Sequence, residues 1–237
     1  MFDKNELESW ISSVANKLGR ECSVYMIGGG AMSFRGLKTA TKDVDLIATD
    51  KNEFEALDMA ILSAGFARAT DLEDEFYLTA LSVYEKGDSR IDVFLNEVGK
   101  MLKFSFDMKK RATLFKEYGK LKIFLASNED IFLFKAMTPR KGDIEDCARF
   151  IREGLNYDII YNECIEQSSE NRRWYFWLFE KVCEIEEQTD MDVPIKAKLF
   201  KIVKEDWSNK PDDFLASVSN PEKHIKDKKL LQQLKEK

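Results

Sequence analysis

The sequence predicts an α/β fold (α+β in arrangement), with a mixed sheet domain at residues 1–150 and a helical region at residues 151–237. Three observations lead to this. Short apolar runs typical of strands alternate with amphipathic helical segments in the first half. A glycine cluster follows the first such run, and the next run carries two aspartates. From Pro139 onward only helical spacing remains, so the boundary is expected within residues 138–155.

The first expected element is a helix over residues 4–19, where apolar side chains recur at helical spacing and Gly19 marks the end. The tripeptide Lys86-Gly87-Asp88 is typical of a hairpin turn between two strands. The other expected elements are strands at residues 22–27, 43–48, 75–85, 89–95 and 120–127, and helices at residues 50–65, 127–137, 142–154, 157–188 and 193–207.

Composition excludes several classes of protein. With 44% hydrophobic and 12% aromatic residues, the 237-residue chain can form a packed core. Its formal net charge of −6 argues against general polyanion binding. No apolar run approaches the ~20 residues that span a bilayer, and the first residues lack the features of a signal peptide. We therefore expect a cytoplasmic protein with no membrane partner.

Cysteine and histidine usage narrows the chemistry further. The cysteines are dispersed and none is paired at metal-ligand spacing, which suits a reducing compartment. His224 is the single histidine, so zinc sites and triads built on histidine are excluded. Any catalysis must use carboxylates, hydroxyls or bound metal ions.

Two carboxylates stand out on the strand expected at residues 43–48. Side chains alternate along a strand, so Asp43 and Asp45 point to the same face while Val44 points to the other. Adjacent carboxylates repel unless a cation lies between them, and Mg²⁺ prefers such oxygens. If a helix starts near Gly30, its free N–H groups could receive a phosphate. Each feature alone also has an ordinary explanation, a solvated acidic pair or a glycine turn.

The combination resembles the nucleotidyltransferase superfamily of the polymerase-β type. The family pattern is an apolar residue and two glycines, about nine to thirteen residues, and then an Asp-x-Asp strand; Ile27-Gly28-Gly29 and Asp43-Val44-Asp45-Leu46 match it. The match is closer to a small prokaryotic branch that contains stand-alone nucleotidyltransferases and toxin components of toxin–antitoxin pairs. Ala31, Lys38 and Thr41 stand where that branch has an alanine, a basic residue and a threonine.

The resemblance implies a third carboxylate on a neighbouring strand. Asp92 lies between Ile91 and Val93 and is the candidate, because an acidic residue inside an apolar strand needs a partner. Asp88 competes with it but falls in the expected turn, where aspartate is ordinary.

A downstream segment also resembles the branch. Lys135 and Arg140 stand where relatives carry basic residues thought to approach nucleotide phosphates. For Asp143 and Asp146, helix capping or ion pairing is the favoured interpretation.

The resemblance implies a nucleoside triphosphate (NTP) as donor and two Mg²⁺ ions held by Asp43, Asp45 and Asp92. Gly28 and Gly29 would let the backbone approach the triphosphate. Ser33 and Lys38 are the candidates for side-chain contacts to the phosphates.

The acceptor is left open between an RNA (such as a tRNA end) and a protein hydroxyl. Residues 101–122 form a basic segment with interleaved aromatics, which would suit a polyanion or form an ordinary solvated helix face. A non-catalytic module with an antitoxin partner is the second hypothesis. A small-molecule transferase, like those that modify aminoglycosides, is the third, and the acidic stretch at residues 70–77 keeps it open. The basic residues of the segment at residues 101–122 are Lys103, Lys109, Lys110, Arg111, Lys116, Lys120 and Lys122.

Overall fold

The chain forms two compact units, Met1–Ser127 and Asn128–Lys237. The predicted boundary at residue 150 lies inside the second unit, within a helix that packs on other helices of that unit. The acidic stretch at residues 70–77 and most of the strand predicted at residues 75–85 lie outside the described residues. The computed structural model describes residues 3–69, 82–99, 101–138, 140, 142–169, 172–209, 228, 229 and 232.

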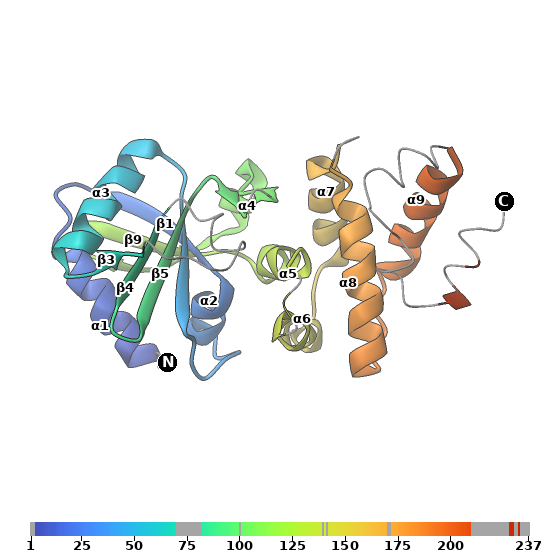
Figure 1. Ribbon diagram of the computed structural model, residues 1–237, viewed down its shortest axis with the longest axis horizontal. Helices are drawn as coiled ribbons and strands as arrows, with labels where there is room; N and C mark the ends of the chain where they lie inside the picture. Colours follow the sequence, from blue (N-terminus) through green and yellow to red (C-terminus); the bar gives the residue numbers. More distant parts are fainter. Residues whose placement is uncertain are drawn as a thin grey trace. The chain divides into compact units, whose positions relative to one another are not determined.

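The first unit is built on a mixed sheet (Figure 1). Among its described residues the sheet has seven strands, in the order β3-β4-β5-β2-β1-β9-β8. β1 runs parallel to β9, and β2 runs parallel to β5, while the other neighbours are antiparallel. The strands are β1 (Cys22–Ile27), β2 (Asp43–Ala48), β3 (Ala67–Arg68), β4 (Ser82–Lys86), β5 (Ser89–Leu95), β8 (Thr113–Tyr118) and β9 (Leu121–Leu125). The mixed α/β fold class is thus confirmed.

Helices of the first unit begin where the sequence supplies caps. Asp3 and Glu6 form a capping box at the start of α1 (Lys4–Ala15). Asp50 caps α3 (Lys51–Ser63), and its carboxylate accepts from the N–H groups of Asn52 and Glu53 at 2.8 and 3.1 Å. The glycine cluster opens a short helix, α2 (Gly28–Phe34), two residues earlier than expected.

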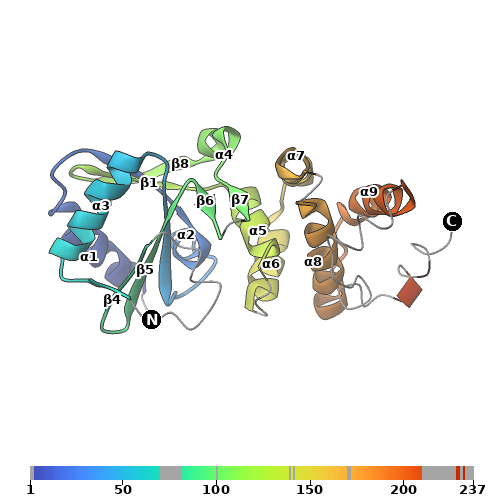
Figure 2. The same ribbon diagram turned by 45° about the horizontal axis from the view of Figure 1, so that its top comes forward.

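Different helices lie over the two faces of the sheet. On one face, here the α3 face, Tyr84 of β4 donates its hydroxyl hydrogen to Asp58 of α3. On the other, here the α4 face, Tyr25 of β1 packs 4.8 Å from Phe104, measured between ring centroids. The amine of Lys109 in α4 (Phe106–Arg111) lies 5.8 Å from the centroid of the Tyr25 ring. In Figure 2, α4 lies apart from α1 and α3, near the small hairpin of β6 (Glu97–Val98) and β7 (Leu102–Lys103).

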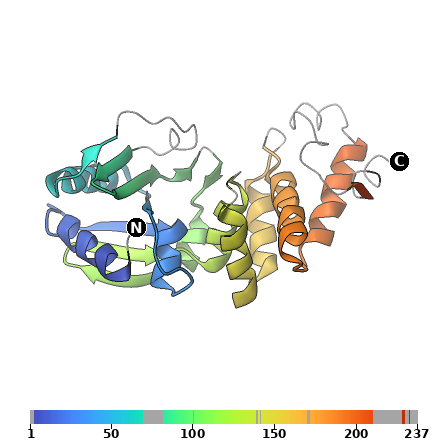
Figure 3. The ribbon, with the colours of Figure 1, turned by 60° about the horizontal axis from the view of Figure 1, so that its bottom comes forward.

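The second unit is helical in its described part, and Figure 3 shows its helices side by side. α5, α6, α7 and α8 pack against one another, and α9 packs on α8. Phe176 and Phe179 of α8 are fully buried and belong to the core of this unit. No described helix is long and apolar enough to cross a membrane. The helices are α5 (Asn128–Ala136), α6 (Gly142–Glu153), α7 (Tyr157–Gln167), α8 (Trp174–Thr189) and α9 (Lys196–Asn209).

Two segments differ from the sequence prediction. Helical spacing extends over residues 157–188, but the structure has two helices there, α7, which ends at Gln167, and α8, which begins at Trp174, with a bridge between Ser169 and Arg172. The basic segment at residues 101–122 is not one helix face. It contains the short helix α4 and the strand β8, which pairs with β9 through a register shift after Leu114. Short elements of this kind are decided by pairing partners rather than by local periodicity.

Candidate active site

The register of β2 and β5 places acidic side chains together. Asp45 pairs directly with Asp92, and Asp43 pairs with Arg90. Residues in register on neighbouring strands point to the same side of a sheet, so all three aspartates share one face. It is the α4 face, because Ile27 pairs with Asp45 and lies two residues after Tyr25 on β1. The structure therefore places Asp43, Asp45 and Asp92 on one face of the sheet, and their predicted role in holding metal ions stays a prediction.

Gly28 lies directly against Asp45. Its φ of +61° is in the left-handed region, which favours glycine. A Cβ atom at this position would overlap with Oδ2 of Asp45. The glycine is therefore needed both for the backbone turn and for the close approach of the chain to the carboxylate.

Gly29 makes the same kind of approach to the loop before β2. A Cβ atom here would overlap with the hydroxyl of Thr41 and would lie 4.0 Å from the amine of Lys38. The Thr41 hydroxyl is buried and donates to the backbone carbonyl of Asp43 at 2.9 Å. Thr41 thus holds the start of β2, and the Lys38 amine lies beside the glycine turn.

Ser33 lies on α2, one turn after the glycines, and is 5% exposed. Its hydroxyl is buried and has no hydrogen-bond partner among the described residues. An unsatisfied buried hydroxyl is uncommon and calls for an explanation, of which a bound ligand is one. The phosphate contact predicted for Ser33 stays a prediction.

The guanidinium group of Arg90 already pairs with the carboxylate of Asp92. Nε of Arg90 is 2.8 Å from Oδ1 of Asp92, and Nη2 is 3.4 Å from Oδ2. The two side chains are 17% and 4% exposed, so the pair is largely shielded from water. Within the described part of the chain, no three His, Cys, Asp or Glu side chains are grouped closely enough to hold a metal ion.

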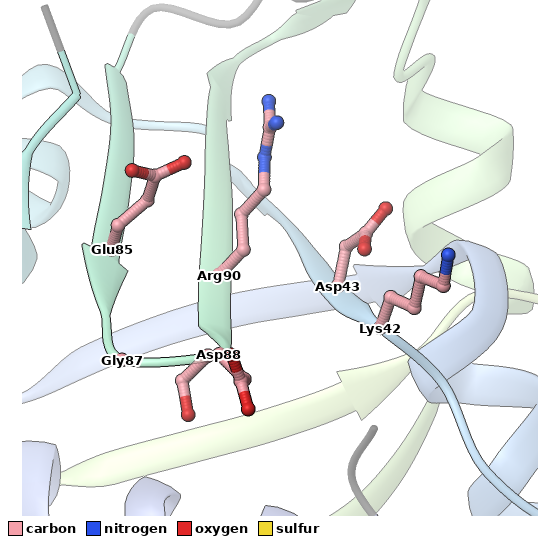
Figure 4. A pocket seen from close by; sticks show the side chains of 7 residues that line it. Lys42, Asp43, Glu85, Gly87, Asp88 and Arg90 are labelled. Atoms are coloured by element: carbon pink, nitrogen blue, oxygen red, sulfur yellow. The ribbon is translucent and has the colours of Figure 1, made fainter.

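A hollow of about 390 Å³ opens beside Asp43. Figure 4 shows Glu85, Arg90 and Asp43 on three neighbouring strands, with their side chains directed to the same side. The registers agree, since Arg90 pairs with Glu85 on one side and with Asp43 on the other. The volume is within the range of small-ligand pockets, and the lining carries both signs of charge. The lining residues are Lys42, Asp43, Glu85, Gly87, Asp88, Ser89 and Arg90.

Lys135 lies in the second unit, inside a buried cluster. Its amine is 2.7 Å from Asp143 and 2.8 Å from Asp146, and the hydroxyl of Thr138 donates to Asp143. Burial alone would lower the pKa of Lys135, but attraction to the two carboxylates outweighs it and raises that pKa above its usual value. These contacts confirm the ion pairing predicted for Asp143 and Asp146, and they account for Lys135 structurally.

Arg140 lies between α5 and α6, and its carbonyl accepts from the N–H of Asp143 at 3.2 Å. Its backbone therefore helps to begin α6. The nucleotide contacts predicted for Lys135 and Arg140 stay predictions.

The sequence interpretation missed the role of Arg90. A usable signal was present, because Arg90 lies two residues before Asp92 and so shares its face. The direction of its side chain, toward Asp92 rather than into solvent, depends on the packing of the neighbouring strands and is not encoded in the spacing.

Comparison with known proteins gave one family and several distant structures. The model of a family described as "Nucleotidyltransferase of unknown function (DUF6036)" matches residues 6–176. The solved structure of the antibiotic-resistance factor ANT(2″)-Ia is similar at 14% identity with a TM-score of 0.46, covering 68% of this chain and 90% of that one. A putative nucleotidyltransferase from Thermotoga maritima is similar at 12% identity with a TM-score of 0.42, covering 64% and 96%. No curated protein matched. The two structural likenesses are too distant to carry an argument about activity.

Proposed function

Because the chain belongs to the family of nucleotidyltransferases of unknown function (DUF6036), we propose that it transfers a nucleoside monophosphate from an NTP to a hydroxyl group of RNA or protein and releases pyrophosphate. One observation carries the proposal. Asp45 and Asp92 lie in register on adjacent parallel strands, with Asp43 on the same face and Gly28 against Asp45.

The donor groups suit divalent cations. Carboxylate oxygens are the ligands that Mg²⁺ prefers, and the absence of a side chain at Gly28 lets the Asp45 carboxylate lie directly against the backbone turn. Asp43, Asp45 and Asp92 would hold the ions, provided that Arg90 releases Asp92. Bound Mg²⁺ supplies charge stabilisation for the entering and leaving oxygens of an in-line displacement.

The remaining residues would position the donor nucleotide. Gly28 and Gly29 would let the backbone approach the triphosphate. On the side where a Cβ atom would stand, Asp45 and Thr41 already lie against them. The Lys38 amine lies beside this turn and would offset phosphate charge. Thr41 keeps the start of β2, and therefore Asp43, in place through its hydrogen bond to the Asp43 carbonyl.

Arg90 is suited to respond to a bound nucleotide. It pairs with Asp92 and lines the hollow next to Asp43. A guanidinium displaced from Asp92 by a metal ion would remain on the same face, where it could hydrogen-bond phosphate oxygens with its fork of donors.

The same ion pair favours a second candidate function. If Arg90 stays on Asp92, the site lacks one carboxylate, and the chain would bind nucleotide or a protein partner without catalysis. Arg90 then supplies the positive charge that a metal ion would supply in an enzyme. The two functions differ in their need for metal, and that need can be measured.

The test uses the full chain with Mg²⁺, each α-labelled NTP, and total cellular RNA or protein as acceptor. We expect label transfer with wild type, and a loss of at least about a hundredfold in Asp45→Asn, because one charge-stabilising group is removed. Asp158→Asn, an exposed carboxylate of the second unit, is the matched control.

Calorimetry with a non-hydrolysable NTP separates the two functions. Nucleotide binding that needs Mg²⁺ and is lost in Asp45→Asn supports the transferase. Metal-independent binding that survives Asp45→Asn, with no transfer to any acceptor, supports the binding module and overturns the transferase.

A further inference from the structure

Apart from Lys103 on β7, the basic residues of the segment at residues 101–122 fall into two groups. Lys116 pairs with Glu8 at 2.9 Å, and Lys122 lies 3.5 Å from Glu21. Lys120 donates to the carbonyl of Gly19 at 2.9 Å. These three lysines thus contact the residues around α1 and the start of β1. The other group lies on α4 and has different surroundings.

The second group includes an exposed aromatic ring. Phe106 at the start of α4 is 70% exposed, and the amine of Lys110 lies 4.4 Å from its ring centroid. Leu114, just after the helix, is 50% exposed. Lys109, Lys110 and Arg111 form the last turn of α4. Asp107, in the first turn, is the only acidic residue of this helix. We call Phe106, Lys109, Lys110, Arg111 and Leu114 the α4 surface.

The α4 surface lies on the same face of the sheet as the three aspartates. The amine of Lys109 lies over the ring of Tyr25 on β1. Ile27, two residues further along β1, pairs with Asp45. Two residues of a strand span about 7 Å, so Tyr25 and the partner of Asp45 are about that far apart along β1. Leu114 pairs with Phe124, whose ring stacks on Tyr25 at 5.2 Å between centroids, so Leu114 is on this face as well.

The α4 surface also lies at the end of the sheet where the candidate site is. Thr113 follows Arg111 by two residues and pairs with Leu125. Leu125 in turn pairs with Met26, two residues before Gly28. The surface and the glycine turn therefore border the same end of β1.

A purely structural explanation covers only part of this arrangement. Basic residues in the last turn stabilise a helix through its dipole, which accounts for Lys109, Lys110 and Arg111. It does not account for an exposed phenyl ring at the first position of the same helix, or for the exposed leucine beside it. Scattered exposed apolar side chains are ordinary, but here they adjoin three cations within a protein of net charge −6.

We propose that the α4 surface binds the single-stranded end of an RNA acceptor and directs it to the carboxylate face. A base would stack on Phe106, and Lys109, Lys110 and Arg111 would contact flanking phosphates, the combination typical of single-strand binding. RNA is the nucleic acid that regularly presents unpaired ends for stacking on aromatic side chains. The inference rests on the proposed transferase function and names its acceptor.

The experiment measures the fluorescence anisotropy of a labelled single-stranded RNA of about 12 nucleotides, a typical single-strand site size, with the full chain at several salt concentrations. Phe106→Ala is expected to weaken binding about tenfold through loss of stacking, and Phe106→Trp is expected to restore it. The double variant Lys109→Gln/Lys110→Gln should lower the slope of log K against log salt by about 1.4, for two lost phosphate contacts. The matched control, Lys120→Gln/Lys122→Gln, removes the same charge from the other group and should bind like wild type.

The outcomes separate this proposal from the proposed function. Asp45→Asn should bind RNA normally while it loses label transfer. The α4 proposal fails if Phe106→Ala and the lysine variant bind RNA like wild type, or if wild type binds no RNA. In that case, label transfer to a protein that depends on Asp45 would still support the transferase. If RNA binding depends on the α4 surface but no NTP is transferred, the surface stands and the transferase fails. The α4 proposal would also be overturned if the chain bound duplex DNA as tightly as single-stranded RNA and if this binding did not depend on Phe106.

Discussion

Two cation–carboxylate clusters in this chain have similar composition but opposite settings. Lys135 in the second unit is held by two aspartates and is 9% exposed. Arg90 in the first unit pairs with Asp92 on a sheet face that also carries Asp43 and borders a hollow. The Lys135 cluster has two carboxylates for its one cation, is buried among helices and stabilises their packing. The Arg90 cluster has three carboxylates on one sheet face and borders a hollow, so we expect that its ion pair can be exchanged for another cation.

The difference shows that a lysine or arginine beside aspartates does not by itself mark a site. What separates the two clusters is the charge balance and the space next to them. At Lys135 the carboxylates come from one helix turn, Asp143 and Asp146, and the hydroxyl of Thr138 occupies a further position on Asp143. At Arg90 the carboxylates come from different strands, and a hollow opens beside one of them, Asp43.

The largest expected effect tests the stabilising role of the Lys135 cluster. Lys135→Met leaves two buried carboxylates without their cation, and we expect a loss of about 3–5 kcal/mol in the free energy of unfolding. Urea denaturation measures it. Lys201→Met removes a lysine from an exposed pair and should change stability by less than about 1 kcal/mol. Equal effects of the two substitutions would show that the cluster contributes no special stability.

The next prediction concerns the space beside Asp45. Gly28→Ala places a side chain against the carboxylate and forces alanine into the left-handed region, so we expect a loss of about 1–2 kcal/mol and at least about a tenfold fall in label transfer. Gly119→Ala is the matched control, because Gly119 has a φ of +59° but nothing within 4 Å of an added Cβ. It should lose similar stability and keep its transfer rate. A Gly28→Ala variant with full activity would contradict the placement of the site.

A smaller effect is expected when the cation on Asp92 is removed. Arg90→Gln leaves the three aspartates repelling one another without competition from a guanidinium. We expect the Mg²⁺ concentration at half-saturation to fall about three- to tenfold, within the range of one typical hydrogen bond. The rise in unfolding temperature with MgCl₂ reports this binding without any need for activity. Arg68→Gln, which removes an exposed partner of Asp58, is the control. An unchanged Mg²⁺ response would show that Arg90 does not compete for the site.

The smallest effect is a pH dependence that belongs to the Lys135 cluster. The folded-state pKa of Lys135 is raised above its usual value of about 10.5, so its stabilisation is fully present below that pH and is lost as the pH rises through the folded-state pKa. The difference in unfolding free energy between wild type and Lys135→Met should therefore be constant from about pH 6 to 9. It should shrink only above about pH 10.5. A difference that already falls near neutral pH would mean that another group governs the cluster.

Much of the first unit was predictable because its signals are local. The run Cys22–Ile27 and the alternation around Asp43 and Asp45 indicate two strands, and the structure has both there, while the glycines between them open helix α2. Helix α3 was predictable because Asp50 is a strong N-cap. By contrast, β8 is defined by its pairing with the next strand, β9, and α7 and α8 are separate helices that pack on each other, and local periodicity indicates neither.

The candidate site divides in the same way. The sequence by itself determined which residues are carboxylates, their alternation along each strand, and the glycines that a close backbone approach requires, because these follow from residue type and a two-residue period. Only the tertiary structure decided that Asp92 lies in register with Asp45, that Arg90 turns to Asp92, and that Lys135 is enclosed by two aspartates. The register of β2 and β5 depends on contacts between segments far apart in the chain, and the direction of each side chain depends on the packing around it, and no local pattern specifies either.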